Sequence, residues 1–183
     1  TAKQEPRYDG YIFDLDGTIY LGEQLIPGAR EKVAWIRGSG CRVVFLSNKP
    51  LEPRANYAAK LTRLGISAEP EDVVNSTQAT LRMLEADLPA GSRVLAVGTN
   101  ALEEQLSGAG FTVVGSLDDD PVAVVQGYSP TIAWHRLEEA ALAVQRGAAW
   151  YATNPDLTRP SDRGIVPGLG SQLAVVRVCV DVD

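Results

Sequence analysis

The stretch YIFDLDGT, residues 11–18, decides how this chain is interpreted. An apolar run ends in two carboxylates one residue apart, and a glycine follows them. The run is typical of a buried strand, and the Asp-Gly pair is typical of a turn. An aspartate can attack phosphorus as a nucleophile, and a second acid can move the protons. The stretch therefore indicates phosphoryl-transfer chemistry at the end of a strand.

The residues around this stretch alternate between strand and helix patterns. Apolar strands are predicted over 11–16 and 42–46, and helices over 29–37 and 53–64. Continuous apolar strands joined by helices indicate a parallel sheet that is covered on both faces. We therefore predict an α/β fold whose Rossmann-like core begins within residues 8–71.

A polar, proline-containing segment at residues 69–72 marks a change in the chain, and a second α/β series follows it. We predict that residues 72–167 form a separate α/β unit inserted after the second core strand. Residues 168–183 are predicted to start a return to the core, and 175–183 alternate like a strand. Within the insert, helices are predicted over 76–88, from Asn100 and over 133–146, and strands over 93–97, 111–114, 122–125 and 150–153.

Two polar motifs are expected to meet at one edge of the core sheet. Asp14 and Asp16 close the first strand, and Ser47-Asn48 closes the second. Ligands of an open parallel sheet bind beyond the carboxyl ends of its strands, and one helical crossover brings both ends to the same edge. Asp14 would attack phosphorus in line. Asp16 would protonate the leaving oxygen and then take a proton from the hydrolytic water.

The same edge is expected to hold phosphate and a cation. Gly17 lets the backbone approach closely, the amides of Leu15 and Gly17 can donate to phosphate oxygens, and Ser47 would hydrogen-bond another. Two carboxylates facing a phosphate dianion repel it, so Mg²⁺ is expected to bridge Asp14 and Asp16. Each motif alone has a plainer interpretation, exposed turn acids or an ordinary strand-ending turn. Their occurrence together favours the functional interpretation.

These motifs resemble those of a known superfamily. FDLDGTIY at 13–20 and FLSN at 45–48 are similar to the first two motifs of the haloacid dehalogenase superfamily. LIPGA at 25–29, ATNPD at 152–156 and GIVPG at 164–168 resemble its nitrophenylphosphatase-like, or NagD-like, branch. The resemblance extends from about residue 10 to residue 174.

The resemblance implies a role for each matching residue. It implies Asp14 as nucleophile, Asp16 as general acid and base, and Ser47 with the Asn48 backbone as phosphate ligands. It places Mg²⁺ on the Asp14 side chain and the Asp16 carbonyl. The second acid, Asp16, favours hydrolysis of a small phosphate monoester. Family members with similar caps act on sugar phosphates, glycerol phosphate, phosphoglycolate or nucleotides, so the resemblance implies one of these substrate classes. The insert would be a cap over the site.

Asn154 and Asp156 have two open interpretations. The resemblance implies that they lie in the cap loop that faces the substrate. The residues alone are equally consistent with a plain turn built on Asn154 and Pro155. The sequence does not separate the two.

Composition excludes some partners. A net charge of −6 and a pI near 4.9 argue against nucleic acid or an anionic membrane as partner. No apolar stretch reaches membrane-spanning length, and the first residues lack a signal-peptide hydrophobic region. Cys41 and Cys179 lie far apart among apolar residues, which predicts buried free thiols and a cytoplasmic protein.

The resemblance also implies parts that this sequence does not contain. A lysine and an acidic cluster are expected after the cap, but no lysine follows Lys60 before the sequence ends at Asp183. The chain would be a fragment, a natural truncation, or a domain completed by another subunit. A second hypothesis is thus a catalytically inactive binding or interaction module. Apolar core faces without partners would favour self-association.

Overall fold

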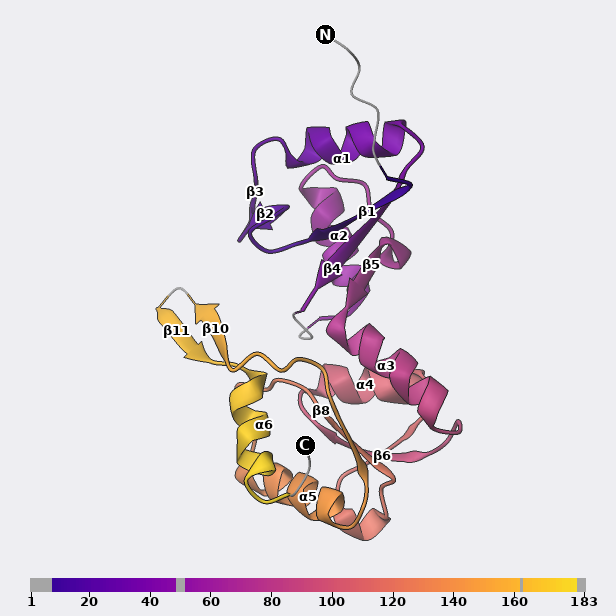
Figure 1. Ribbon diagram of the computed structural model, residues 1–183, viewed down its shortest axis with the longest axis vertical. Coiled ribbons are helices and arrows are strands. Elements are labelled where there is room, and N and C mark those ends of the chain that lie inside the picture. Colours follow the sequence, from indigo (N-terminus) through magenta and orange to yellow (C-terminus); the bar gives the residue numbers. More distant parts are fainter. Residues whose placement is uncertain (1–7, 49–51, 162, 181–183) are drawn as a thin grey trace. The chain divides into compact units, whose positions relative to one another are not determined.

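The computed structural model describes residues 8–48, 52–161 and 163–180, which form two compact units (Figure 1). The first unit contains residues 8–48 and 52–75, and the second contains residues from 76 onward. Both are α/β units with parallel sheets, so the predicted fold class is confirmed. The division after Asn75 falls a few residues beyond the predicted boundary at residue 72, because a third strand of the first unit occupies that stretch.

The first unit is a parallel sheet in the order β1-β4-β5. Two of its strands match the predicted ones, and the short β5 was not predicted. Its three residues follow a 3-10 turn at Pro70–Asp72, and too few alternating positions remain to give a strand pattern. The elements are β1 (Gly10–Asp14), the hairpin strands β2 (Tyr20–Leu21) and β3 (Gln24–Leu25), α1 (Ala29–Gly38), β4 (Arg42–Ser47), α2 (Arg54–Arg63) and β5 (Val73–Asn75).

The core of the first unit lies on one face of this sheet. Helices α1 and α2 bury apolar stripes against Val43 and Phe45 of β4. Crossovers that are right-handed and step in one direction, from β1 to β4 to β5, place their helices on the same face. The opposite face carries Ile12 and Leu46, which are 68% and 39% exposed. The prediction that the sheet is covered on both faces is therefore wrong for the described residues of this unit.

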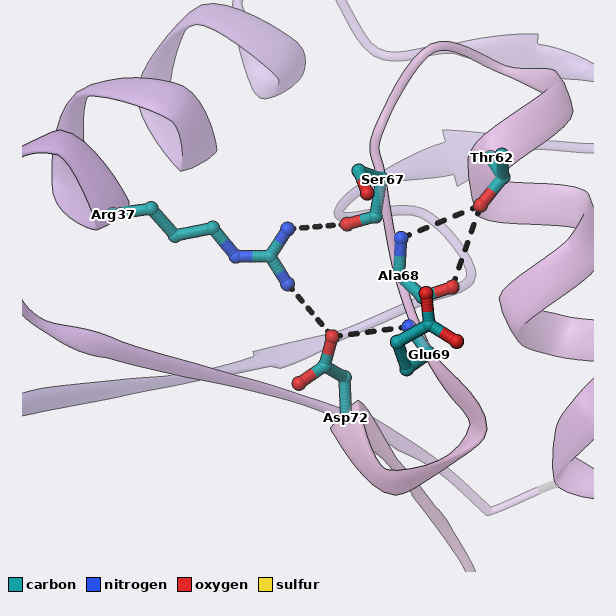
Figure 2. Close-up of polar contacts among 6 residues, drawn as sticks. All are labelled: Arg37, Thr62, Ser67, Ala68, Glu69 and Asp72. Atoms are coloured by element: carbon teal, nitrogen blue, oxygen red, sulfur yellow. Dashed lines mark hydrogen bonds and ion pairs between the residues drawn. The ribbon is translucent and has the colours of Figure 1, made fainter.

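A polar network fixes the chain that leads into β5 (Figure 2). Arg37, at the end of α1, donates to the Ser67 carbonyl and, over 3.1 Å, to the Asp72 carboxylate. The same carboxylate accepts from the Glu69 amide over 3.1 Å. Arg37 also lies over the Phe45 ring. One guanidinium thus joins the end of α1, the turn before β5 and the central strand β4.

The second unit is a four-stranded parallel sheet in the order β7-β6-β8-β9, with a separate antiparallel hairpin β10-β11. The hairpin was not predicted, because its two strands have only four residues each and give too few alternating positions for a strand pattern. The elements are α3 (Ser76–Asp87), β6 (Arg93–Val97), α4 (Asn100–Gly108), β7 (Thr112–Val114), a 3-10 turn (Leu117–Asp119), β8 (Ala123–Gln126), α5 (Trp134–Gln145), β9 (Ala149–Ala152), β10 (Thr158–Ser161), β11 (Gly164–Pro167) and α6 (Leu169–Arg177).

Both faces of this second sheet are covered. Leu95 and Val124 point into a cluster with α5 and α6, whereas Val94 and Val125 point into one with α3 and α4. The four residues of β8 are all buried. Alternating side chains of one strand therefore enter two separate cores, as expected for a sheet between two helix layers.

The end of the chain differs from its prediction. The strand-like alternation at 175–183 overlaps helix α6, and the structure does not describe residues 181–183. Leu173 and Val176 of α6 are buried, Val176 in the core cluster shared with α5, so this segment packs in the second unit. Cys41 is half-buried and Cys179 is exposed, which corrects the prediction of two buried thiols. No helix in the described part of the chain is long and apolar enough to cross a membrane.

Candidate active site

The acid pair lies at the carboxyl end of β1 and in the turn that follows. Asp14 is the last residue of β1 and is exposed, Leu15 is fully buried, and Asp16 is half-buried. The Leu15 carbonyl accepts from the amides of Ile19 and Tyr20 over 2.9 and 3.2 Å. We call residues 14–20 the acid turn. It is closed by its backbone hydrogen bonds and by burial of Leu15, and the two acids lie on either side of that residue.

Gly17 has a backbone requirement of its own in this turn. Its φ of +81° lies in the left-handed region, which residues other than glycine rarely adopt. Its amide donates to the Tyr20 carbonyl over 2.8 Å, which closes the turn from the other side. A glycine here is therefore needed to return the chain after Asp16.

The two predicted motifs meet at one edge of the sheet. In the parallel register of β1 and β4, Asp14 pairs with Leu46, so Ser47 and Asn48 follow at the same level as the acid turn. Ser47 is 6% exposed and ends β4, and Asn48 is exposed. The expected convergence of Asp14, Asp16 and the second motif is confirmed. Their chemical roles remain a proposal.

Buried polar side chains surround Ser47. Asn75 pairs with Ser47 in the register of β4 and β5, is 2% exposed, and donates from Nδ2 to the Glu52 carbonyl over 3.1 Å. The Tyr57 hydroxyl of α2 is hydrogen-bonded to the Ser47 side chain. Burial raises the pKa of Tyr57 to about 12. The sequence pattern identified Tyr57 only as part of an apolar helix stripe, because nothing in that spacing reports where its hydroxyl points.

A second tyrosine places a hydroxyl near the acids. Tyr20 is 1% exposed, and burial raises its pKa, with smaller contributions from the negative charges of Asp16 and Asp14. The Lys60 ammonium lies 4.1 Å from the centre of its ring and 3.2 Å from the Glu23 carboxylate. Glu23, between β2 and β3, also accepts from Arg63. These contacts fasten the hairpin after the acid turn to α2.

Asn154 and Asp156 lie in the second unit, in the loop after β9. The Asp156 amide donates to Asn154 Oδ1 over 2.7 Å, which is a side-chain-closed turn. The Gly170 amide of α6 donates to the Asp156 carbonyl over 2.8 Å. The loop therefore has the turn structure that the residues alone predicted, and its orientation toward a substrate stays a prediction.

The acid turn offers oxygen ligands suited to a hard cation. Asp14 and Asp16 supply two carboxylates one residue apart, and Mg²⁺ binds few protein carboxylates while keeping several waters or substrate oxygens. No group of three or more His, Cys, Asp or Glu side chains able to hold a metal occurs among the described residues. The donor set therefore fits Mg²⁺ held by two acids, and does not provide a complete cage.

The family of the chain follows from comparisons with known proteins. A model of haloacid dehalogenase-like hydrolases matches residues 11–112. The D-glycerol 3-phosphate phosphatase of Mycobacterium tuberculosis is 41% identical over 176 residues, which are 96% of this chain and 49% of that protein. An acid sugar phosphatase of Staphylococcus haemolyticus is 35% identical over 93% of this chain and 64% of its own length. The chain belongs to the haloacid dehalogenase-like hydrolase family.

Solved structures support the same assignment. The mycobacterial glycerol phosphate phosphatase has been solved with magnesium and with calcium, and the magnesium complex gives a TM-score of 0.87 over 96% of this chain and 52% of that one. A p-nitrophenyl phosphatase of Archaeoglobus fulgidus is 29% identical, with a TM-score of 0.87 over 94% of this chain and 65% of that one. The resemblance to the nitrophenylphosphatase-like branch is confirmed. The chain spans about half the length of the mycobacterial relative and about two thirds of the others.

Proposed function

We propose that this chain carries the nucleophile of a phosphatase that hydrolyses small phosphate monoesters through an aspartyl-phosphate. The observation that carries the proposal is the meeting of Asp14 and Asp16 with Ser47 and Asn48 at the carboxyl edge of one parallel sheet. A nucleophile, a proton carrier and phosphate donors are the parts this reaction needs. The names of the relatives support it, since all of those reported above are phosphatases.

The proposed reaction has two steps. An Asp14 carboxylate oxygen attacks phosphorus, the bond from phosphorus to the ester oxygen breaks, and Asp16 gives its proton to the leaving oxygen. Water then attacks the phosphorus of the aspartyl-phosphate and gives a proton to Asp16, and inorganic phosphate leaves Asp14 as a free carboxylate. Ser47 and the backbone amides of Leu15, Gly17 and Asn48 would hold the phosphate oxygens through both steps.

Mg²⁺ is the proposed cofactor, held by the Asp14 side chain and by Asp16. When bound, it supplies positive charge that offsets the repulsion between the carboxylates and the phosphate. Glycerol phosphate and sugar phosphates are the substrate classes that the names of these relatives support. Asn154 and Asp156 would contact the organic part of the substrate. The alternative of an inactive module is not favoured by these comparisons.

Hydrolysis of p-nitrophenyl phosphate with and without Mg²⁺ tests the proposal. Wild type should require Mg²⁺, and Asp14→Asn should fall to the rate without protein, because an amide does not attack phosphorus. Asp16→Asn should lower kcat by roughly 10²–10⁴, the contribution of a general acid and base. Asp9→Asn, an acid outside the turn, serves as the control. Equal rates for wild type and Asp14→Asn would falsify the assignment of the nucleophile.

A further inference from the structure

The hydroxyl of Tyr57 is the polar end of a side chain that otherwise belongs to the core. Tyr57 is 7% exposed and lies on the buried face of α2 with Ala58 and Leu61. Its hydroxyl reaches Ser47, which is 6% exposed at the end of β4, and the two side chains are hydrogen-bonded. A helix residue ten positions further along the chain therefore contacts the second motif directly.

The number of hydroxyl protons available determines which of the two side chains donates in this hydrogen bond. A serine hydroxyl has one proton to donate and lone pairs that accept. If Ser47 donates its proton to a phosphate oxygen, its bond to Tyr57 must be one in which Tyr57 donates. Burial raises the pKa of Tyr57 by more than the hydrogen bond with Ser47 lowers it, so the phenol keeps its proton at neutral pH and can be that donor.

The surroundings hold the pair in place. Asn75, next to Ser47 in the sheet, donates to the carbonyl of Glu52, which lies two residues before α2. The start of α2 is thus tied to the strand ends, and Tyr57 lies in its first turn. A hydroxyl on a fixed helix is suited to orient a neighbour, because little freedom remains to be lost when the ligand binds.

We propose that Tyr57 is a positioning residue of the phosphate site, whose O–H holds Ser47 Oγ so that the Ser47 proton points to the bound phosphate. The inference rests on the proposed function, since it takes Ser47 as a phosphate ligand. It adds a residue from α2 to a site otherwise built from the ends of β1 and β4.

A double-mutant cycle with inorganic phosphate tests the inference. Calorimetric binding to the full chain with Mg²⁺ is compared for wild type, Tyr57→Phe, Ser47→Ala and the double variant. Loss of one net hydrogen bond predicts that Tyr57→Phe weakens binding roughly threefold to tenfold. If Tyr57 acts through Ser47, the double variant matches Ser47→Ala within about twofold. With p-nitrophenyl phosphate, Tyr57→Phe should raise KM more than it lowers kcat.

Tyr151→Phe is the matched control. It also removes one tyrosine hydroxyl, bonded to Asp87 over 2.8 Å in the second unit, and it should leave phosphate binding unchanged. If Ser47→Ala weakens phosphate binding and Tyr57→Phe does not, the inference is overturned and the proposed phosphate site stands. The same holds if Tyr57→Phe weakens binding equally in wild type and in the Ser47→Ala background. Wild-type affinity in Ser47→Ala, or no binding by wild type, overturns the proposed phosphate site as well.

A second measurement covers the case in which Tyr57→Phe does not fold. In protein with carbon-labelled tyrosine rings, Ser47→Ala should shift the resonance of one tyrosine Cζ, and phosphate should shift the same resonance in wild type. The absence of a shared resonance would contradict the inference.

Discussion

The parallel sheets of the two units differ in how many of their faces are buried. The sheet of the second unit has both faces buried, and all four residues of β8 are inaccessible. The sheet of the first unit buries one face under α1 and α2 and leaves Ile12 and Leu46 exposed on the other. Both use parallel strands with helical connections. The difference therefore lies in the order of the strands.

Strand order determines which faces receive helices. In the second unit the chain steps from β6 to β7, then returns to the other side of β6 for β8 and β9, so α4 and α5 fall on opposite faces. In the first unit the chain steps only from β1 through β4 to β5, and never reverses. One change of direction thus lets the crossover helices of an open parallel sheet cover both of its faces.

The largest difference is expected for matched leucines on the two sheets. Leu95 on β6 is fully buried and Leu46 on β4 is 39% exposed. Leu95→Ala should cost about 2–5 kcal/mol of unfolding free energy, as for other core leucines, and Leu46→Ala about 1 kcal/mol or less. Chemical denaturation gives the totals, and hydrogen exchange assigns them to a unit. Similar losses for both variants would show that the face bearing Leu46 is covered in solution.

A smaller difference is expected for two helical glycines of the second unit. A Cβ at Gly170 of α6 would overlap the Pro155 carbonyl and lie 2.8 Å from the Leu157 amide nitrogen. Gly170→Ala should therefore cost about 1–3 kcal/mol and speed hydrogen exchange in the loop of Asn154 and Asp156.

Gly108 of α4 is the matched control for that substitution. A Cβ there meets nothing within 4 Å, and Gly108 is absent from the residues with positive φ. Gly108→Ala should stabilise the chain by about 0.5–1 kcal/mol. A neutral Gly170→Ala would mean that the loop moves away from α6 at little cost.

The last expected effect is absent at neutral pH and is a loss of stability in alkali, centred on the first unit. Burial raises the pKa of Tyr57 from 10.0 to about 12 and also raises the pKa of Tyr20. The folded state holds these protons more tightly than the unfolded chain, so their contribution is complete below pH 10 and is lost as the pH rises through about 12. Tyr57→Phe should lose less stability across this interval, followed by tyrosinate absorbance and circular dichroism. An unchanged profile would contradict the assignment to Tyr57.

The main elements were predictable where a pattern had room to repeat. The strand at 93–97 was predicted with its observed ends, and α1, α2 and α5 to within one or two residues, because turns of helix repeat an apolar stripe. The three-residue strand β5 and the hairpin β10-β11 offered no such repeat. The α6 segment was predicted in part as a strand because Val176, Val178 and Val180 alternate along the sequence, whereas in the structure Val176 packs in a cluster with α5 and the helix ends at Arg177.

The candidate site was predictable where its residues follow strands directly. Parallel pairing brings the end of β1 to the end of β4, so Asp14, Asp16, Ser47 and Asn48 could be placed together from their positions alone. Tyr57 could not, since its spacing reports a buried helix face and not the partner of its hydroxyl. Contacts between a helix side chain and a strand end depend on three-dimensional packing, which spacing does not record.

In the acid turn, the residue that stabilises the fold is not one of the residues proposed to react. Leu15 is fully buried and its carbonyl closes the turn, while Asp14 and Asp16 on either side are at least partly accessible. A substitution at either acid therefore leaves the burial of Leu15 and the hydrogen bonds of its carbonyl in place. Such a site can exchange its chemistry over evolutionary time without losing its fold, since reactive and structural positions alternate along the same few residues.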